Sequence, residues 1–204
     1  LSPKIWNMVF DGLLQNFEMG PVKAIGFADD GLLIIRGKDL GTMVSLMNSA
    51  IKKAVNWGKH CGLKFSAEKT QVVTFTRKRI KKEKDKHKIK MEGKYLQYSN
   101  EATYLGITLD SRLTWTTHIK NKITKGKQLL FAVKKSSGKI WGPKPRVMTW
   151  LYKAIVRPTM TYGALCWNEA TKKATIKKEL GRLQRLALVG TLQVKRSTPV
   201  TAVE

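Results

Sequence analysis

The stretch AIGFADDGLLII, residues 24–35, places two adjacent carboxylates, Asp29 and Asp30, between two apolar runs. The runs VKAIGF and GLLIIR are short and only ADD separates them, which predicts a β-hairpin with the carboxylates at its tip. Adjacent carboxylates repel each other, and burying one without a partner is costly. The pair could bind a divalent cation through hard oxygen ligands, or it could be an ordinary Asp-Asp turn. Taken alone, the dipeptide favours the turn.

The segments on either side of this hairpin predict both helices and strands. Apolar residues recur at fourth-residue spacing over residues 5–17, which predicts an amphipathic helix that Ser2-Pro3 begins and Gly20-Pro21 ends. A second helix is expected from Asp39 to a C-cap at Gly62. Strands are expected at residues 71–75 and over EATYLGITLD, which ends near Asp110.

The remainder of the chain has helical character. Helices are expected over residues 118–135, 147–156 and 176–189, with chain breaks at Gly142-Pro143, at Pro158 and at Gly163. This order of elements predicts an α+β fold in two parts, with a boundary near residue 112.

The charge of the chain points to a polyanionic partner. Its 204 residues include 39 Lys and Arg against 14 Asp and Glu, a net charge of +25. A charge of this size favours nucleic acid, and no apolar run is long enough to span a membrane. Residues 77–94 are dense in lysine and are expected to form a solvated loop that can also contact phosphates. The two cysteines, Cys61 and Cys166, lack zinc-site spacing and are expected to be reduced intracellular thiols.

The tetrad Phe27-Ala28-Asp29-Asp30 resembles the aromatic-x-Asp-Asp box in the palm hairpin of reverse transcriptases. Other segments follow in the order typical of non-LTR, LINE-type retrotransposon enzymes. Leu1-Ser2-Pro3 resembles the motif before that hairpin, and Glu68-Lys69-Thr70 resembles the palm motif after it. Tyr104-Leu105-Gly106 resembles the primer-grip hairpin. Two segments resemble the thumb region: Leu113-Thr114-Trp115 and Arg157-Pro158. A later segment, Leu183-Gln184-Arg185, resembles the stretch that precedes an RNase H domain in some elements.

The resemblance implies an RNA-directed DNA polymerase, a nucleotidyltransferase that extends a primer 3′-hydroxyl with dNTPs on an RNA template, using two Mg²⁺ ions. It makes residues 1–112 the C-terminal part of the palm and residues 113–204 the helical thumb and connection region. In the complete enzyme a further palm aspartate and the fingers precede Leu1, and an RNase H domain can follow residue 204. The chain is therefore expected to be inactive on its own.

The resemblance also assigns roles to individual residues. Asp29 is the direct metal ligand and Asp30 the supporting one, while Lys69 neutralises charge on the triphosphate, with Lys64 as the substitute candidate. Residues expected beside the substrate are Phe27, Ser2 and Pro3, and those expected in the primer grip are Leu105 and Gly106.

Two sets of side chains are candidates for contact with the RNA–DNA hybrid. Lysines of the predicted helix 118–135 are expected to contact phosphates without reading sequence: Lys120, Lys122, Lys125, Lys127, Lys134 and Lys135. Five aromatic residues could stack on bases, although their helical spacing favours a place in the core: Trp115, Trp141, Trp150, Tyr162 and Trp167.

An alternative function is a non-catalytic nucleic-acid-binding remnant of a degenerate retrotransposon copy. Under the main interpretation the protein is expected in the nucleus when it acts on chromosomal DNA, and in the cytoplasm as a ribonucleoprotein. No membrane partner is expected.

Overall fold

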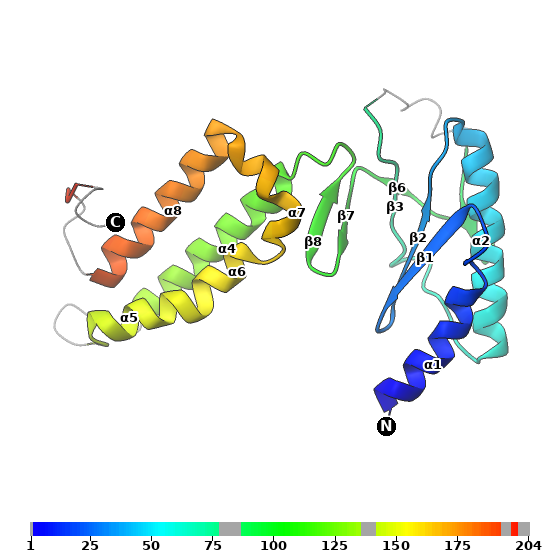
Figure 1. Ribbon diagram of the computed structural model, residues 1–204, viewed down its shortest axis with the longest axis horizontal. Helices are drawn as coiled ribbons and strands as arrows, with labels where there is room; N and C mark the ends of the chain where they lie inside the picture. The colour runs from blue at the N-terminus through cyan, green and yellow to red at the C-terminus, as the bar shows by residue number, and fades with distance from the viewer. Residues whose placement is uncertain (1, 78–86, 136–141, 193–196, 200–204) are drawn as a thin grey trace. The chain divides into compact units, whose positions relative to one another are not determined.

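The computed structural model describes residues 2–77, 87–135, 142–192 and 197–199. The chain forms two compact units, Leu1–Asn100 and Glu101–Glu204. Helices and small two-stranded sheets occur together in the described residues, which confirms the predicted α+β class (Figure 1). The division lies earlier than the predicted boundary near residue 112, because the hairpin over residues 101–110 packs against the helix that follows it.

The first unit begins with a helix and a hairpin. Helix α1 spans Ser2–Gln15, and strands β1 (Val22–Phe27) and β2 (Asp30–Ile35) pair antiparallel. Helix α2 spans Leu40–His60, and Asp39 caps it by accepting a hydrogen bond from the Thr42 N–H at 2.6 Å. These elements confirm the predicted hairpin and the two predicted helices, although α1 begins and ends earlier than expected.

Two hydrophobic clusters hold this unit together, and α2 contributes to both. Ala50 and Ala54 of α2 pack with residues of α1 and β1, beneath the hairpin. Val44, Ile51 and Val55, on the neighbouring side of α2, pack with a later segment that includes Ile89 and Met91. The short strands of this second region are β3 (Val72–Val73), β4 (Lys90–Met91), β5 (Lys94–Tyr95) and β6 (Tyr98–Ser99).

The lysine-rich segment 77–94 differs from its prediction. Residues 78–86 lie outside the described part of the chain. Residues 87–94 are ordered into β4 and the turn to β5, and Ile89 and Met91 are buried. The interpretation as a solvated loop is therefore wrong for this part, because apolar residues alternate with lysines at the period of a strand. The strand predicted at 71–75 is also shorter, since β3 has only two residues.

The second unit starts with a hairpin and continues as helices (Figure 1). Strands β7 (Glu101–Tyr104) and β8 (Ile107–Asp110) pair antiparallel, so the single strand expected over 101–110 is wrong and the hairpin implied by the resemblance is present. The helices are α4 (Thr116–Lys135), α5 (Pro145–Leu151), the π-helix η1 (Tyr152–Val156), α6 (Arg157–Thr161), α7 (Ala164–Trp167), the 3₁₀-helix η2 (Asn168–Lys172) and α8 (Ala174–Leu192).

Only one of the predicted breaks within residues 145–170 separates one helix from the next. Gly163 does so with φ +68°, a left-handed conformation that suits glycine. Pro158 does not, because it lies in the first turn of α6, directly after the π-helix. A proline has no N–H to donate, and the wider turn ahead of it accommodates that loss, with the Arg157 N–H bonded to the Tyr152 carbonyl.

Helices α4 and α8 supply most of the hydrophobic core of the second unit. Its buried residues include Ile119 and Ile123 of α4, Trp167 of α7 and Leu183 of α8. Across the described ranges, no helix has the length and apolar character that crossing a bilayer would require.

Candidate active site

The hairpin tip exposes the two carboxylates. Phe27 and Asp30 face each other across the strands, and Ala28 and Asp29 form the connection. Asp29 and Asp30 are both exposed. In the part of the chain that the structure describes, neither carboxylate makes a hydrogen bond or an ion pair, so their oxygens are available to a cation. Ala28 has φ +51°, a conformation that costs a residue with a Cβ about 1 kcal/mol.

Helix α1 holds this strained tip in place. The Trp6 indole Nε1 donates a hydrogen bond of 2.6 Å to the Ala28 carbonyl. The Trp6 ring stacks on Phe10, with centroids 5.7 Å apart. A Cβ on Gly26 would lie 2.0 Å from Cε1 of Phe10, so the backbone of β1 can approach the ring only because residue 26 is glycine. The orientation of the tip therefore depends on α1.

The residues predicted to lie beside the substrate are found at the hairpin tip and in the first turn of α1. Phe27 flanks the carboxylates, and its ring is 61% exposed. Ser2 and Pro3 are exposed in the first turn of α1, about one turn before Trp6. The structure brings Phe27, Asp29 and Asp30 together at one tip. Sequence reasoning missed Trp6, for which the signal was an aromatic residue four positions before Phe10 on one helix face.

Lys69 lies away from this tip in the chain, in the turn between α2 and β3. Its backbone N–H donates to the Ser66 hydroxyl at 3.3 Å, and its side chain is exposed, as is that of Lys64. The neighbouring Glu68 pairs with Lys94 at 3.2 Å, but both side chains are solvated and the pair adds little stability. No interaction within the described ranges joins the Lys69 ammonium to Asp29 or Asp30, so its catalytic role stays a prediction.

The donor set at the tip suits a hard cation but is incomplete. Carboxylate oxygens are the ligands that Mg²⁺ prefers, and Asp29 and Asp30 provide them side by side. Among the residues that the structure describes, no three Asp, Glu, His or Cys side chains come together as a metal site. The tip alone therefore offers part of a coordination shell.

Side chains from the helical part of the second unit fix the turn between β7 and β8. Leu105 and Gly106 join β7 to β8 with φ +48° and +73°, which is the backbone of a tight two-residue turn. The Tyr162 hydroxyl donates to the Leu105 carbonyl at 2.8 Å, and its ring lies 3.4 Å from where a Cβ on Gly106 would be. Lys122 of α4 lies over the same ring, with Nζ 4.6 Å from the centroid. The turn is thus fixed against the helices of its unit.

Buried polar groups secure the base of this hairpin. The Thr108 N–H donates to Nδ1 of His118 at 3.1 Å, and His118 is only 1% exposed. Burial lowers the pKa of His118, the charge of Lys122 adds to this, and the Tyr162 backbone opposes it. Burial disfavours charge on Asp110, yet hydrogen bonds from the backbone N–H groups of Thr114 and Trp115 hold its pKa below the usual value. Sequence analysis assigned neither residue a role.

All six candidate lysines lie on α4, where they fall into two groups. Lys120, Lys127 and Lys134 recur every seven residues, so they share one exposed side and follow each other by about 10.5 Å. Lys125 and Lys135 are also exposed. Lys122 is half-buried against Tyr162, and burial together with the charge of Lys125 lowers its pKa. The first group is therefore better placed to contact an extended polyanion.

The five aromatic candidates divide between core and surface. Trp167 is buried and Trp115 packs against the same cluster, as the core interpretation predicts. Trp150 and Tyr162 are instead 63% and 49% exposed. Trp141 lies outside the described residues.

Comparison with known proteins places the chain in a family. Residues 1–109, more than half of the chain, match the family described as reverse transcriptase (RNA-dependent DNA polymerase). The chain belongs to the reverse transcriptase family. Within this family it is similar along its whole length to a retrovirus-related Pol polyprotein from the type-1 retrotransposable element R1 of Nasonia vitripennis, with 24% identity.

Further relatives of this reverse transcriptase chain come from the same kind of element. A putative 115 kDa protein of the R1DM element of Drosophila melanogaster is 25% identical over all of the chain, and the RNA-directed DNA polymerase of the mobile element jockey is 26% identical over 72% of it. These matches support a non-LTR, LINE-type origin. The chain spans 61% of the Nasonia protein, 19% of the R1DM protein and 16% of the jockey protein. No solved structure gives a significant match.

Proposed function

We propose that this chain carries the C-terminal palm and the thumb of an RNA-directed DNA polymerase that extends a primer 3′-hydroxyl with dNTPs on an RNA template. One observation carries the proposal: in a reverse transcriptase chain, two exposed adjacent carboxylates stand at a hairpin tip that α1 clamps through Trp6. An ordinary solvent turn would not need an indole hydrogen bond to its backbone and an aromatic ring packed beneath it.

In this proposal the tip residues hold Mg²⁺ and the nucleotide. Asp29 supplies the direct ligand and Asp30 the supporting one, while the exposed ring of Phe27 packs beside the incoming nucleotide near Ser2 and Pro3. Two bound Mg²⁺ ions would stabilise the attacking and leaving oxygens during phosphoryl transfer. The remaining ligands come from a segment outside this chain, so the 204 residues alone do not polymerise. Lys69 neutralises charge on the triphosphate.

The second unit would hold the RNA–DNA hybrid. The Leu105-Gly106 turn would form the primer grip, because the Tyr162 hydroxyl fixes its backbone through the Leu105 carbonyl. The spacing of Lys120, Lys127 and Lys134, about 10.5 Å, corresponds to about three phosphates along one strand. Contacts of this kind are independent of sequence. The same proposal places the enzyme in the nucleus during insertion and in a cytoplasmic ribonucleoprotein before it, with an RNase H domain as a neighbour in the polyprotein.

A specific observation keeps the alternative function open. Lys120, Lys127 and Lys134 share one exposed side of α4, where they can contact a phosphate backbone without any catalysis at the tip. A degenerate copy that has lost the third ligand would bind hybrid through α4 and catalyse nothing.

The test uses a polypeptide that joins this chain to the further segments of its R1 relatives. We expect Asp29→Asn to abolish single-turnover primer extension and to leave hybrid affinity nearly unchanged, because Asn keeps the size of Asp and loses the charge that binds a cation. Asp30→Asn should be less damaging. Asp11→Asn, an equal charge change at an exposed residue of α1, is the matched control.

The outcomes separate the two functions. Near-normal extension by the Asp29→Asn variant would show that the tip is an ordinary turn and not a metal site. Failure of the unsubstituted polypeptide to extend, with hybrid binding intact, would favour the non-catalytic remnant.

A further inference from the structure

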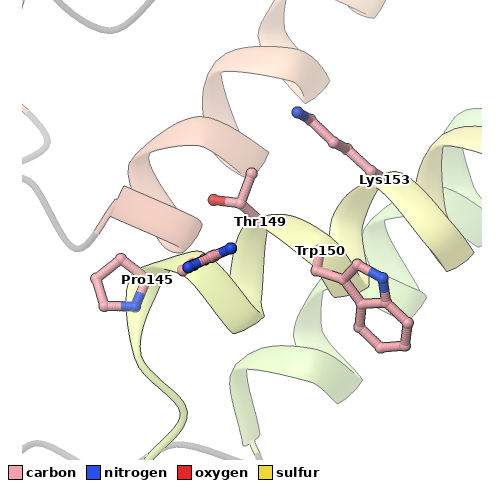
Figure 2. A pocket seen from close by; sticks show the side chains of 5 residues that line it. Pro145, Thr149, Trp150 and Lys153 are labelled. Atoms are coloured by element: carbon pink, nitrogen blue, oxygen red, sulfur yellow. The ribbon is translucent and has the colours of Figure 1, made fainter.

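The helical run from α5 into η1 presents an aromatic ring to solvent. Trp150 is 63% exposed, whereas Met148 and Val156 of the same run are buried in the second unit. The ring borders a shallow hollow of about 380 Å³, which is lined by Pro145, Arg146, Thr149, Trp150 and Lys153. Figure 2 shows the Trp150 indole and the Lys153 side chain extending in different directions from the same helical run, and both line the hollow. Packing within the unit does not account for the position of this indole.

The charge around the hollow has one sign. Residues 142–163 contain no Asp or Glu, and their cationic residues are Lys144, Arg146, Lys153 and Arg157. Arg146 and Trp150 are four residues apart and therefore neighbours on one helix face. Within the described ranges, neither Arg146 nor Lys153 has an ion-pair partner. A negatively charged ligand in the hollow would meet two cations that lack an ion-pair partner in the described residues, one before and one after Trp150 in the sequence.

The dimensions suit a short length of unpaired nucleic acid. Arg146 and Lys153 are seven residues apart, which is about 10 Å along a helix and matches about three stacked nucleotides of one strand. Every base has a flat face that can stack on an indole, and its flanking phosphates can reach cations beside the ring. In a duplex the bases stack on each other, so only an unpaired base is available to Trp150.

We propose that the α5–η1 face is a binding site for single-stranded nucleic acid, in which an unpaired base stacks on Trp150 and the adjacent phosphates contact Arg146 and Lys153. The site is separate from the phosphate contacts of α4 and does not depend on polymerisation at the hairpin tip. A protein partner would use the exposed ring but would not require these cations.

The test measures binding of labelled 12-nucleotide probes to the 204-residue chain by fluorescence anisotropy. The probes are a single-stranded RNA, a single-stranded DNA, an abasic strand of equal length and an RNA–DNA hybrid. We expect Trp150→Ala to weaken binding of the base-bearing single strands about fivefold or more, and to change binding of the abasic strand and the hybrid less than twofold. Trp150→Phe keeps a ring and should retain most of the affinity. The control is Leu165→Ala, which truncates another apolar side chain, 99% exposed, on α7.

Charge variants give a second, independent readout. Arg146→Gln and Lys153→Gln should each weaken every single strand, abasic included, and lower the salt slope of binding by about one. A larger Trp150→Ala effect with RNA would identify template, and a larger effect with DNA would identify a displaced or target strand. Equal weakening of abasic and base-bearing strands would overturn the proposal. No change with any probe, at matched thermal stability, would also overturn it and would favour a protein partner.

Discussion

Gly26→Ala is the sharpest test of how α1 positions the hairpin tip that carries Asp29 and Asp30. A Cβ at this position would lie 2.0 Å from Cε1 and 2.7 Å from Cδ1 of Phe10, whereas ordinary contacts begin at 3.4 Å. The ring would therefore have to move by about 1.4 Å, the difference between the first and last of these distances. It has little room, because Trp6 stacks on one side of it and Trp57 packs edge-on at 6.2 Å. Overpacking of this kind costs about 3 kcal/mol.

The cross-strand neighbour Gly31 provides a matched control. Gly26 and Gly31 face each other in the hairpin, but a Cβ on Gly31 would lie 3.7 Å from Phe10, an ordinary contact. We expect Gly31→Ala to be neutral or to stabilise by about 0.5 kcal/mol through the unfolded chain. Hydrogen exchange of hairpin peptides measures the local opening. A loss of about 3 kcal/mol raises exchange on the order of 100-fold, while peptides of the second unit should not change.

A rescue variant completes this experiment. Phe10→Leu removes the ring atoms that a Cβ on residue 26 would meet, so the double variant should lose less stability than the two single losses added together. Equal exchange in the Gly26→Ala and Gly31→Ala proteins would refute the reasoning, since it would mean that α1 does not pack against the hairpin as described.

Two further predictions concern the second unit. Burial lowers the pKa of His118 below its ordinary value of about 6.5, so the unfolded chain binds a proton that the folded unit resists; stability should be full above pH 6.5 and fall as the pH drops below it. Denaturation of the unit at pH 7.5 and pH 5 checks this, and an equal loss in His118→Gln would contradict it. Binding of an RNA–DNA hybrid should weaken steeply with salt, and replacing Lys120, Lys127 and Lys134 with Gln should lower the log–log slope by about three; an unchanged slope would exclude α4 as the phosphate contact.

The hairpin and α2 were predictable because their signals are local. Two short apolar runs separated only by Ala28, Asp29 and Asp30 predict a hairpin, and Asp39 caps α2 as its residue type suggests. The tetrad at residues 27–30 also indicated the tip without knowledge of the packing. In each case the decisive residues lie within a few positions of each other.

The structure differs from the sequence predictions where contacts between residues far apart in the chain determine the local conformation. Leu105 adopts a left-handed conformation that no residue preference predicts, and the Tyr162 hydroxyl stabilises it from 57 residues away. The π-helix before Pro158 allows the helix to continue where proline alone predicts a break. The roles of Trp6 and Gly26 depend on the packing of α1 against β1, which the sequence alone does not indicate.

The central claim is that the hairpin tip binds a metal ion. Its most direct test is to locate the site at which a divalent cation binds the 204-residue chain. Mn²⁺ can replace Mg²⁺ at oxygen ligands, and it broadens the NMR signals of nearby amides. We predict that Mn²⁺ selectively broadens the amides of residues 27–31, that excess Mg²⁺ restores them, and that Asp29→Asn abolishes the effect. Broadening at Asp29 no greater than at the exposed Asp11, or unchanged in Asp29→Asn, would contradict the assignment of the tip as the metal site.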